Sequence, residues 1–161
     1  MILFRVVCFL QMLLTVFLSF TSLMYLIRTG RFYFFLESVF FILIASLAIL
    51  GISLVATNYP DKPVAGKQKI VFNWLFLFNF LLLSFIFGLV FAEFRQLEII
   101  ASLFDKPVFT LSFQLMVPFI TNLIILGFQF IILYGLYTLR RQLFENFFAS
   151  QQFEFENKSQ D

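Results

Sequence analysis

Four long, uninterrupted apolar runs constrain this chain more than any other feature of its sequence. They cover Val6–Ile27, Phe32–Ala56, Ile70–Phe91 and Phe113–Leu139. The hydrocarbon core of a bilayer is about 30 Å thick and takes about 20 helical residues to cross, so each run can form a transmembrane helix. The strands of a membrane β-barrel are shorter, at about ten residues, and alternate in polarity. The sequence therefore predicts an all-α, integral membrane four-helix bundle.

Composition and charge agree with a membrane protein. Of the 161 residues, 61% are hydrophobic and 12% charged, which leaves too few polar side chains to cover a soluble surface. The 11 basic and 9 acidic residues are scattered and give a net charge of +2, so nucleic acid is not an expected partner. We expect one domain, residues 1–148, surrounded by the lipid bilayer.

The connections between the runs set the topology. Arg28–Arg31 is so short that the first two helices must form an antiparallel hairpin, and Gly30 suits its turn. Asn58–Lys69 contains two prolines and one glycine, which predicts a turn-rich loop without a helix. Ala92–Ser112 has two interpretations, a short helix lying in the interface or a simple continuation of the third helix beyond the bilayer.

Basic residues favour one side of the predicted bundle. Seven lie on the side of the termini and four on the other. The seven are Arg5, Lys62, Lys67, Lys69, Arg140, Arg141 and Lys158. The positive-inside rule then places both termini and the second loop in the cytoplasm. We expect a multi-pass protein of the bacterial inner (cytoplasmic) membrane, with an organellar inner membrane as the alternative.

The sequence lacks the residues that most enzyme and metal sites need. It has no histidine, the usual proton shuttle and the commonest metal ligand, and a single cysteine, Cys8, cannot form a thiolate cluster. No glycine-rich phosphate loop is present. We therefore expect a non-enzymatic protein with no catalytic residue, metal or cofactor.

Five polar residues form a candidate intramembrane site. Glu37 is the only ionisable side chain well inside a predicted span, which makes it a functional candidate by default. Its depth, about five residues from the start of the span, favours instead a headgroup-level residue paired with Arg31 or Arg28. The others are the amides of Gln11, Asn79, Asn122 and Gln129. These amides should face the bundle interior because lipid cannot satisfy them, either as inter-helical hydrogen bonds or as a polar pathway for a small solute.

A second candidate region follows the fourth run. Its apolar residues recur at helical spacing and predict a short amphipathic C-terminal cytoplasmic helix. Leu143, Phe144, Phe147 and Phe148 form its candidate docking face, to be covered by the membrane surface or by a partner. The polar tail, residues 149–161, is expected to be disordered.

The C-terminal segment also carries a resemblance. Leu133–Phe147, with Phe153, Glu156 and Asn157, resembles a segment of a bacterial family of small four-helix membrane proteins classed as domain of unknown function 2975. The resemblance implies a bacterial membrane protein and, since the function of that family is unknown, no particular activity.

Two functional hypotheses remain. The first is an accessory protein or small subunit of the inner membrane that acts through a membrane-protein partner or as a homo-oligomer. The alternative is a small transporter or channel component that uses Glu37 and the intramembrane polar stripes. A lipid-modifying enzyme is the least favoured because catalytic clusters are missing.

The charge bias yields a prediction about topology. With Cys8 replaced by alanine, a cysteine at Ser102 should react with a membrane-impermeant thiol reagent from outside the cell, and a cysteine at Val64 only from the cytoplasm. Reaction of the Ser102→Cys variant from the cytoplasmic side alone would overturn the predicted orientation.

Overall fold

The chain is helical almost throughout. The computed structural model describes the backbone of residues 2–58 and 66–158, and the side chains of 2–56, 70–142, 144 and 145. Its elements are α1 (Ile2–Thr29), α2 (Phe32–Asn58), α3 (Gly66–Leu103), the short 3₁₀ helix η1 (Val108–Thr110) and α4 (Phe113–Lys158). The described residues include no strand, and all four α-helices are long and apolar enough to cross a membrane, which confirms the prediction of an all-α protein with four helices able to span a bilayer.

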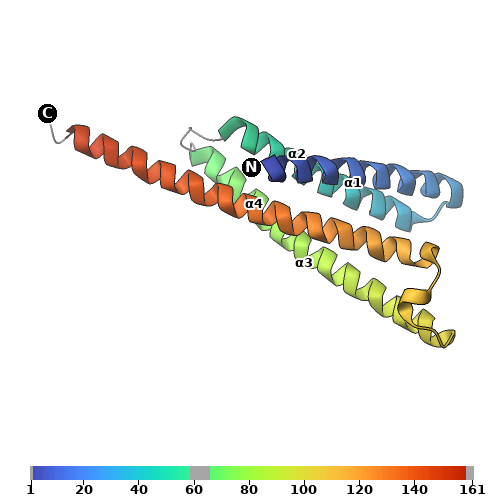
Figure 1. The fold of residues 1–161 in the computed structure, drawn as a ribbon. Helices are drawn as coiled ribbons and strands as arrows, with labels where there is room; N and C mark the ends of the chain where they lie inside the picture. The colour runs from blue at the N-terminus through green and yellow to red at the C-terminus, as the bar shows by residue number, and fades with distance from the viewer. Residues whose placement is uncertain (1, 59–65, 159–161) are drawn as a thin grey trace.

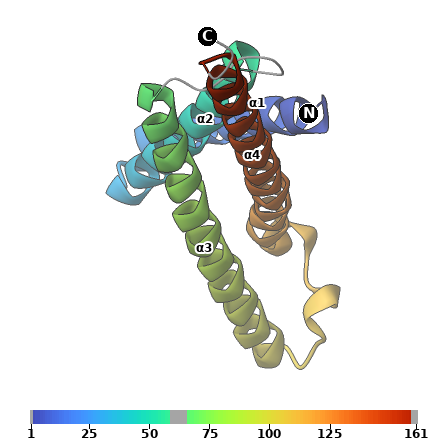
Figure 2. The same ribbon diagram turned by 90° about the vertical axis from the view of Figure 1, so that its left-hand side faces the viewer.

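The helices form two antiparallel hairpins. α1 packs closely along α2, and α3 packs along α4 (Figure 1). The hairpins meet mainly where α1 lies on α4, whereas α2 touches α3 only sparsely. Toward its C-terminal end α3 diverges from α1 and α2, as Figure 2 shows. The seam between α2 and α3 is therefore the weakest side of the bundle.

The turn after α1 and the turn after α3 each begin with a residue in the left-handed backbone conformation, which ends the preceding helix. Gly30 has a φ of 66°, and its N–H donates to the carbonyl of Leu26 at 2.8 Å. Asp105 has a φ of 51° and ends α3 in a Schellman motif, in which the N–H of Lys106 donates to the carbonyl of Ala101 at 3.0 Å. Pro107 then prevents further helix.

The bounds of α3 decide between the alternatives for one predicted connection and shorten another. α3 is one continuous helix to Leu103, so the structure has the simple continuation and no separate interfacial helix over Ala92–Ser112. Nothing in the sequence before Asp105 breaks the helix. α3 begins at Gly66, so the last residues of the predicted Asn58–Lys69 loop are helical, and residues 59–65 lie outside the described part.

The C-terminal backbone differs from the expected disordered tail. α4 is helical through Lys158 and extends beyond the other three helices (Figure 1). Propagation of an existing helix fixes one residue per hydrogen bond, without a new nucleation step, which favours continuation of α4 from the membrane span. Residues 159–161 lie outside the described part, as do the side chains of residues 146–158.

The interior contains two apolar clusters. One lies toward the N-terminus of α1 and joins all four helices through Phe4, Val7, Cys8, Ala48, Val55, Phe72, Leu75, Ile132, Leu136 and Leu139. The other lies toward the inter-helical turns and consists of Phe41, Ile44, Leu82, Ile86, Ile125 and Leu126. Most other large apolar side chains are exposed, as expected where lipid covers them.

Phe4 holds the first cluster together by packing against two glycines. Its ring lies against Gly51 of α2 and Gly135 of α4, where a Cβ on Gly51 would come within 3.3 Å of the ring and one on Gly135 would overlap it. Small residues let helices approach closely in a membrane, and here they make room for an aromatic ring from α1. The position of α1 between α2 and α4 depends on this fit.

The packing of Phe4 predicts that two glycine substitutions differ in their effect on the free energy of unfolding. Gly135→Ala should lower the free energy of unfolding by about 1 to 3 kcal/mol, because the new methyl group overlaps the ring. Gly127→Ala, with nothing within 4 Å of its Cβ position, should be neutral or stabilising. Thermal unfolding in detergent, followed by circular dichroism, measures both. Equal melting temperatures for the two variants would contradict the role of Phe4.

Candidate functional site

A chain of buried amides crosses the interior between the two apolar clusters. Gln11 Nε2 of α1 donates to Gln129 Oε1 of α4 at 3.0 Å. Gln129 Nε2 donates in turn to Asn79 Oδ1 of α3 at 2.7 Å and to the Asn79 carbonyl at 3.1 Å. All three side chains are at most 2% exposed. The chain of amides therefore joins three helices in an environment that lipid cannot reach.

This geometry favours inter-helical bonding for these three amides. Asn79 Nδ2 donates to the carbonyl of Leu75 at 2.8 Å, which completes the chain on α3. Gln11 Oε1 is the one amide oxygen of the three that is buried without a hydrogen-bond partner. In hydrocarbon an unpaired amide is costly, so the amides hold the hairpins in one register.

Hydroxyl groups continue the polar stripe of α1 away from the amides. Thr15 Oγ1 donates to the carbonyl of Gln11 at 2.8 Å, and Ser19 and Ser38 share a hydrogen bond of 2.8 Å between α1 and α2. One turn further, Ser22 Oγ donates to Glu37 Oε2 at 3.0 Å. The hydroxyl groups of α1 therefore lead from the buried amide chain to the carboxylate of Glu37.

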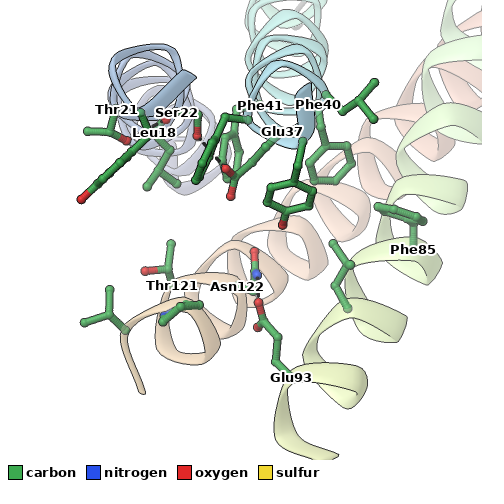
Figure 3. Close-up of a pocket in the computed structure, with 17 residues that line it drawn as sticks. Leu18, Thr21, Ser22, Glu37, Phe40, Phe41, Phe85, Glu93, Thr121 and Asn122 are labelled. Atoms are coloured by element: carbon green, nitrogen blue, oxygen red, sulfur yellow. Dashed lines mark hydrogen bonds between the residues drawn. The ribbon is translucent and has the colours of Figure 1, made fainter. Parts of the chain in front are cut away.

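Glu37 lies in the wall of a cavity of about 550 Å³ that all four helices line. Glu93 of α3 lies on the opposite wall, where its Oε1 accepts a hydrogen bond of 2.9 Å from Asn122 Nδ2 of α4. Figure 3 shows the Ser22–Glu37 pair and the Asn122–Glu93 pair facing each other across the cavity. Each hairpin thus contributes one carboxylate, held by a neutral donor.

Among the described residues, no basic side chain pairs with the two carboxyl groups of the cavity. Glu93 Oε2 is buried with no hydrogen-bond partner. Among the described residues that line the cavity, none is lysine or arginine. The described ion pairs are both elsewhere, between Arg95 and Glu98 and between Arg141 and Glu145.

Aromatic rings form much of the remaining wall. They are Tyr25, Tyr33, Phe34, Phe40, Phe41 and Phe85. Phe40 of α2 and Phe85 of α3 meet edge to face, with ring centroids 5.1 Å apart. Carboxylates combined with aromatic faces are the groups that recognise organic cations in proteins, through charge and the ring quadrupole.

The five predicted polar residues therefore divide into two groups. Gln11, Asn79 and Gln129 form the buried amide chain, whereas Glu37 and Asn122 line the cavity. An arginine was the expected partner of Glu37, and in the structure its oxygen accepts from Ser22 instead.

Glu93 is the site residue that the sequence analysis missed. It was assigned to the third connection because polarity rises after Phe91. The inward-facing positions of α3 nevertheless continue past it at steps of three and four: Phe72, Leu75, Asn79, Leu82 and Ile86 are buried, Val90 and Glu93 are half-buried, and Leu97 and Ala101 are buried again. Glu93 falls in this register, four residues before Leu97, and the register is the signal that identifies it.

Only part of the predicted docking face is described. Phe144 is half-buried, and the guanidinium carbon of Arg140 lies 5.8 Å from its ring centroid and 5.9 Å from that of Phe76 on α3. Leu143, Phe147 and Phe148 have side chains outside the described residues. The amphipathic character of this end stays a prediction.

No protein-family model, curated protein or solved structure matches this chain. The resemblance of the C-terminal segment to domain of unknown function 2975 stays a prediction. The chemistry of the cavity is therefore the main guide to function.

The amide chain predicts a non-additive mutant series. Gln129→Leu leaves Gln11 Nε2 and Asn79 Oδ1 unpaired and should lower the free energy of unfolding by about 1 to 3 kcal/mol. Replacing all three amides with leucine removes donors and acceptors together, so the triple variant should be more stable than Gln129→Leu alone.

Thermal unfolding in detergent measures the series, with Ser84→Ala as the control because that hydroxyl is exposed and bonds its own helix. A triple variant less stable than the single one would refute the inter-helical role.

Proposed function

We propose that this protein binds a cationic solute between Glu37 and Glu93 and acts as a small transporter or channel component. The observation that supports the proposal is the cavity of about 550 Å³, whose two carboxylates come from different hairpins. A cation between them would be attracted to both walls at once. Binding would therefore stabilise one arrangement of the hairpins relative to the other.

The cost of unpaired charge supports the same proposal. Carboxylates within membrane spans are costly and rare, and such residues mark ion or substrate pathways. Ser22 and Asn122 each supply one neutral hydrogen bond, which orients the carboxyl groups and contributes no positive charge. A bound cation or proton would supply the missing compensation.

The proposed activity is binding and passage of a solute, without covalent chemistry. The sequence has no histidine and one cysteine, so the groups that commonly activate nucleophiles or bind catalytic metals are lacking. We expect a non-enzymatic protein that needs no cofactor.

The location follows from the charge bias of the loops. We place the protein in a bacterial inner membrane, with both termini cytoplasmic. Glu37 lies five residues after the start of α2, about 8 Å along the helix from the Gly30 turn, so the cavity would be close to the outer surface. A solute from outside would then meet the carboxylates before the amide chain.

A second candidate function is that of an accessory subunit. It is supported by α4, whose C-terminal backbone extends beyond the other helices (Figure 1). An extended helix with the predicted face Leu143, Phe144, Phe147 and Phe148 would offer a membrane-protein partner, or a second copy, a surface to bind. The two functions are compatible, because a subunit can contain a solute site.

A binding measurement tests the cavity. The purified protein in nanodiscs of phosphatidylcholine should bind tetraethylammonium, and Glu37→Gln and Glu93→Gln should each weaken that affinity by about tenfold or more, as removal of a close charge does. Both substitutions keep an acceptor for Ser22 or Asn122. Isothermal titration calorimetry measures the dissociation constants.

Glu98→Gln is the matched control, because that carboxylate forms a surface ion pair with Arg95 at 3.3 Å. Tetraethylammonium affinity that is unchanged in both cavity variants, or lost equally in the control, would refute the proposed function.

A further inference from the structure

A second hollow lies beside the cavity, in the weak seam between α2 and α3. It is a groove of about 530 Å³, and its lining is entirely leucine and phenylalanine. The lining residues are Phe40, Leu43, Leu47 and Leu50 of α2, and Phe78, Leu81, Leu82 and Phe85 of α3. No polar side chain contributes to it among the described residues. The groove therefore has no means of binding a charged group.

The groove and the cavity share two residues. Phe40 and Phe85 line both, and their edge-to-face contact separates the two spaces. On one side of this pair are the carboxylates of Glu37 and Glu93, and on the other side only apolar side chains. A single molecule that occupied both spaces would need a cationic end and an apolar end.

The outer part of the groove lies on the lipid-facing side of the helices. Leu43 and Leu81, one on each helix, are about half exposed, at 52% and 54%. Phe40 and Leu50 are ten residues apart on α2, so the groove extends about 15 Å along the helix, a length comparable with a decyl chain. An apolar chain in it could remain in contact with lipid throughout.

We infer that the substrate class of this protein is an amphiphilic cation, with the cationic head in the cavity and the apolar tail in the groove. The inference rests on the proposed function and specifies its ligand. The molecule enters sideways from the bilayer through the seam between α2 and α3, and its entry requires the rings of Phe40 and Phe85 to part. Because these two helices contact each other only sparsely, little other packing opposes that movement.

Alkyltrimethylammonium ions of increasing chain length test the inference. They compete with radiolabelled tetraethylammonium for the full-length protein in phosphatidylcholine nanodiscs. Apparent affinity should rise with chain length from methyl to decyl, by up to roughly fourfold for each methylene that leaves water. Decyl sulfate, with the same tail and a negative head, should not displace the label.

Two substitutions distinguish binding of the apolar tail in the groove from simple partition of the tail into lipid. Leu43→Trp and Leu81→Trp should fill the groove and weaken the binding of decyltrimethylammonium by about tenfold or more, since the indole ring overlaps the position of the tail. Tetraethylammonium affinity should stay within about twofold, which also shows that the variants fold. Leu123→Trp, at a lipid-facing position of α4 outside the groove, should behave as the unmodified protein.

The outcomes distinguish the two proposals. If tetraethylammonium binds through Glu37 and Glu93, but decyltrimethylammonium competes equally well in the groove variants and the unmodified protein, the inference fails and the proposed function stands. If the groove variants change only the oligomeric mass, the groove binds a second copy and the inference again fails. If no Glu-dependent binding of tetraethylammonium is found, the proposed function itself fails.

Discussion

Lipid offers no hydrogen bonds, and the arrangement of this protein follows from that constraint. A polar side chain inside the bilayer must find its partner within the chain, whereas leucine and phenylalanine are equally stable inside or outside the bundle. The polar residues therefore decide which face of each helix is internal. In the structure, Gln11, Asn79 and Gln129 form hydrogen bonds to one another across three helices, and the apolar clusters pack on either side of them.

The same constraint explains what could be predicted from sequence. Helix number, the Gly30 turn and the inward direction of the amides depend on local composition and spacing, and the structure has them as predicted. The pairing of Glu93 with Asn122 depends on how α3 and α4 align, which no single run of residues encodes. Hydropathy falls at Glu93, yet the helix and its buried register continue past it.

The cavity exists because the hairpins contact each other unevenly. Phe4 joins α1 to α2 and α4 near the N-terminus, and the amide chain joins α1, α3 and α4 about one to two turns further along. Beyond these contacts α3 diverges from α1 and α2, and the carboxylates of the two hairpins face each other across open space (Figures 2 and 3). A well-packed end and an open end thus coexist in one small bundle.

Pro118 lies near the start of α4, so a change of helix direction at this residue would move the whole length of the helix beyond it. This proline lines the cavity and lacks an N–H, so the carbonyl of Gln114 has no helical partner at that point. From Pro118 to Lys158 the helix measures about 60 Å, twice the thickness of a hydrocarbon core. A tilt of about 5° at this weak point moves the far end by about 5 Å. A small change of angle in the wall of the cavity would therefore reach the far end of α4 as a displacement of several ångströms.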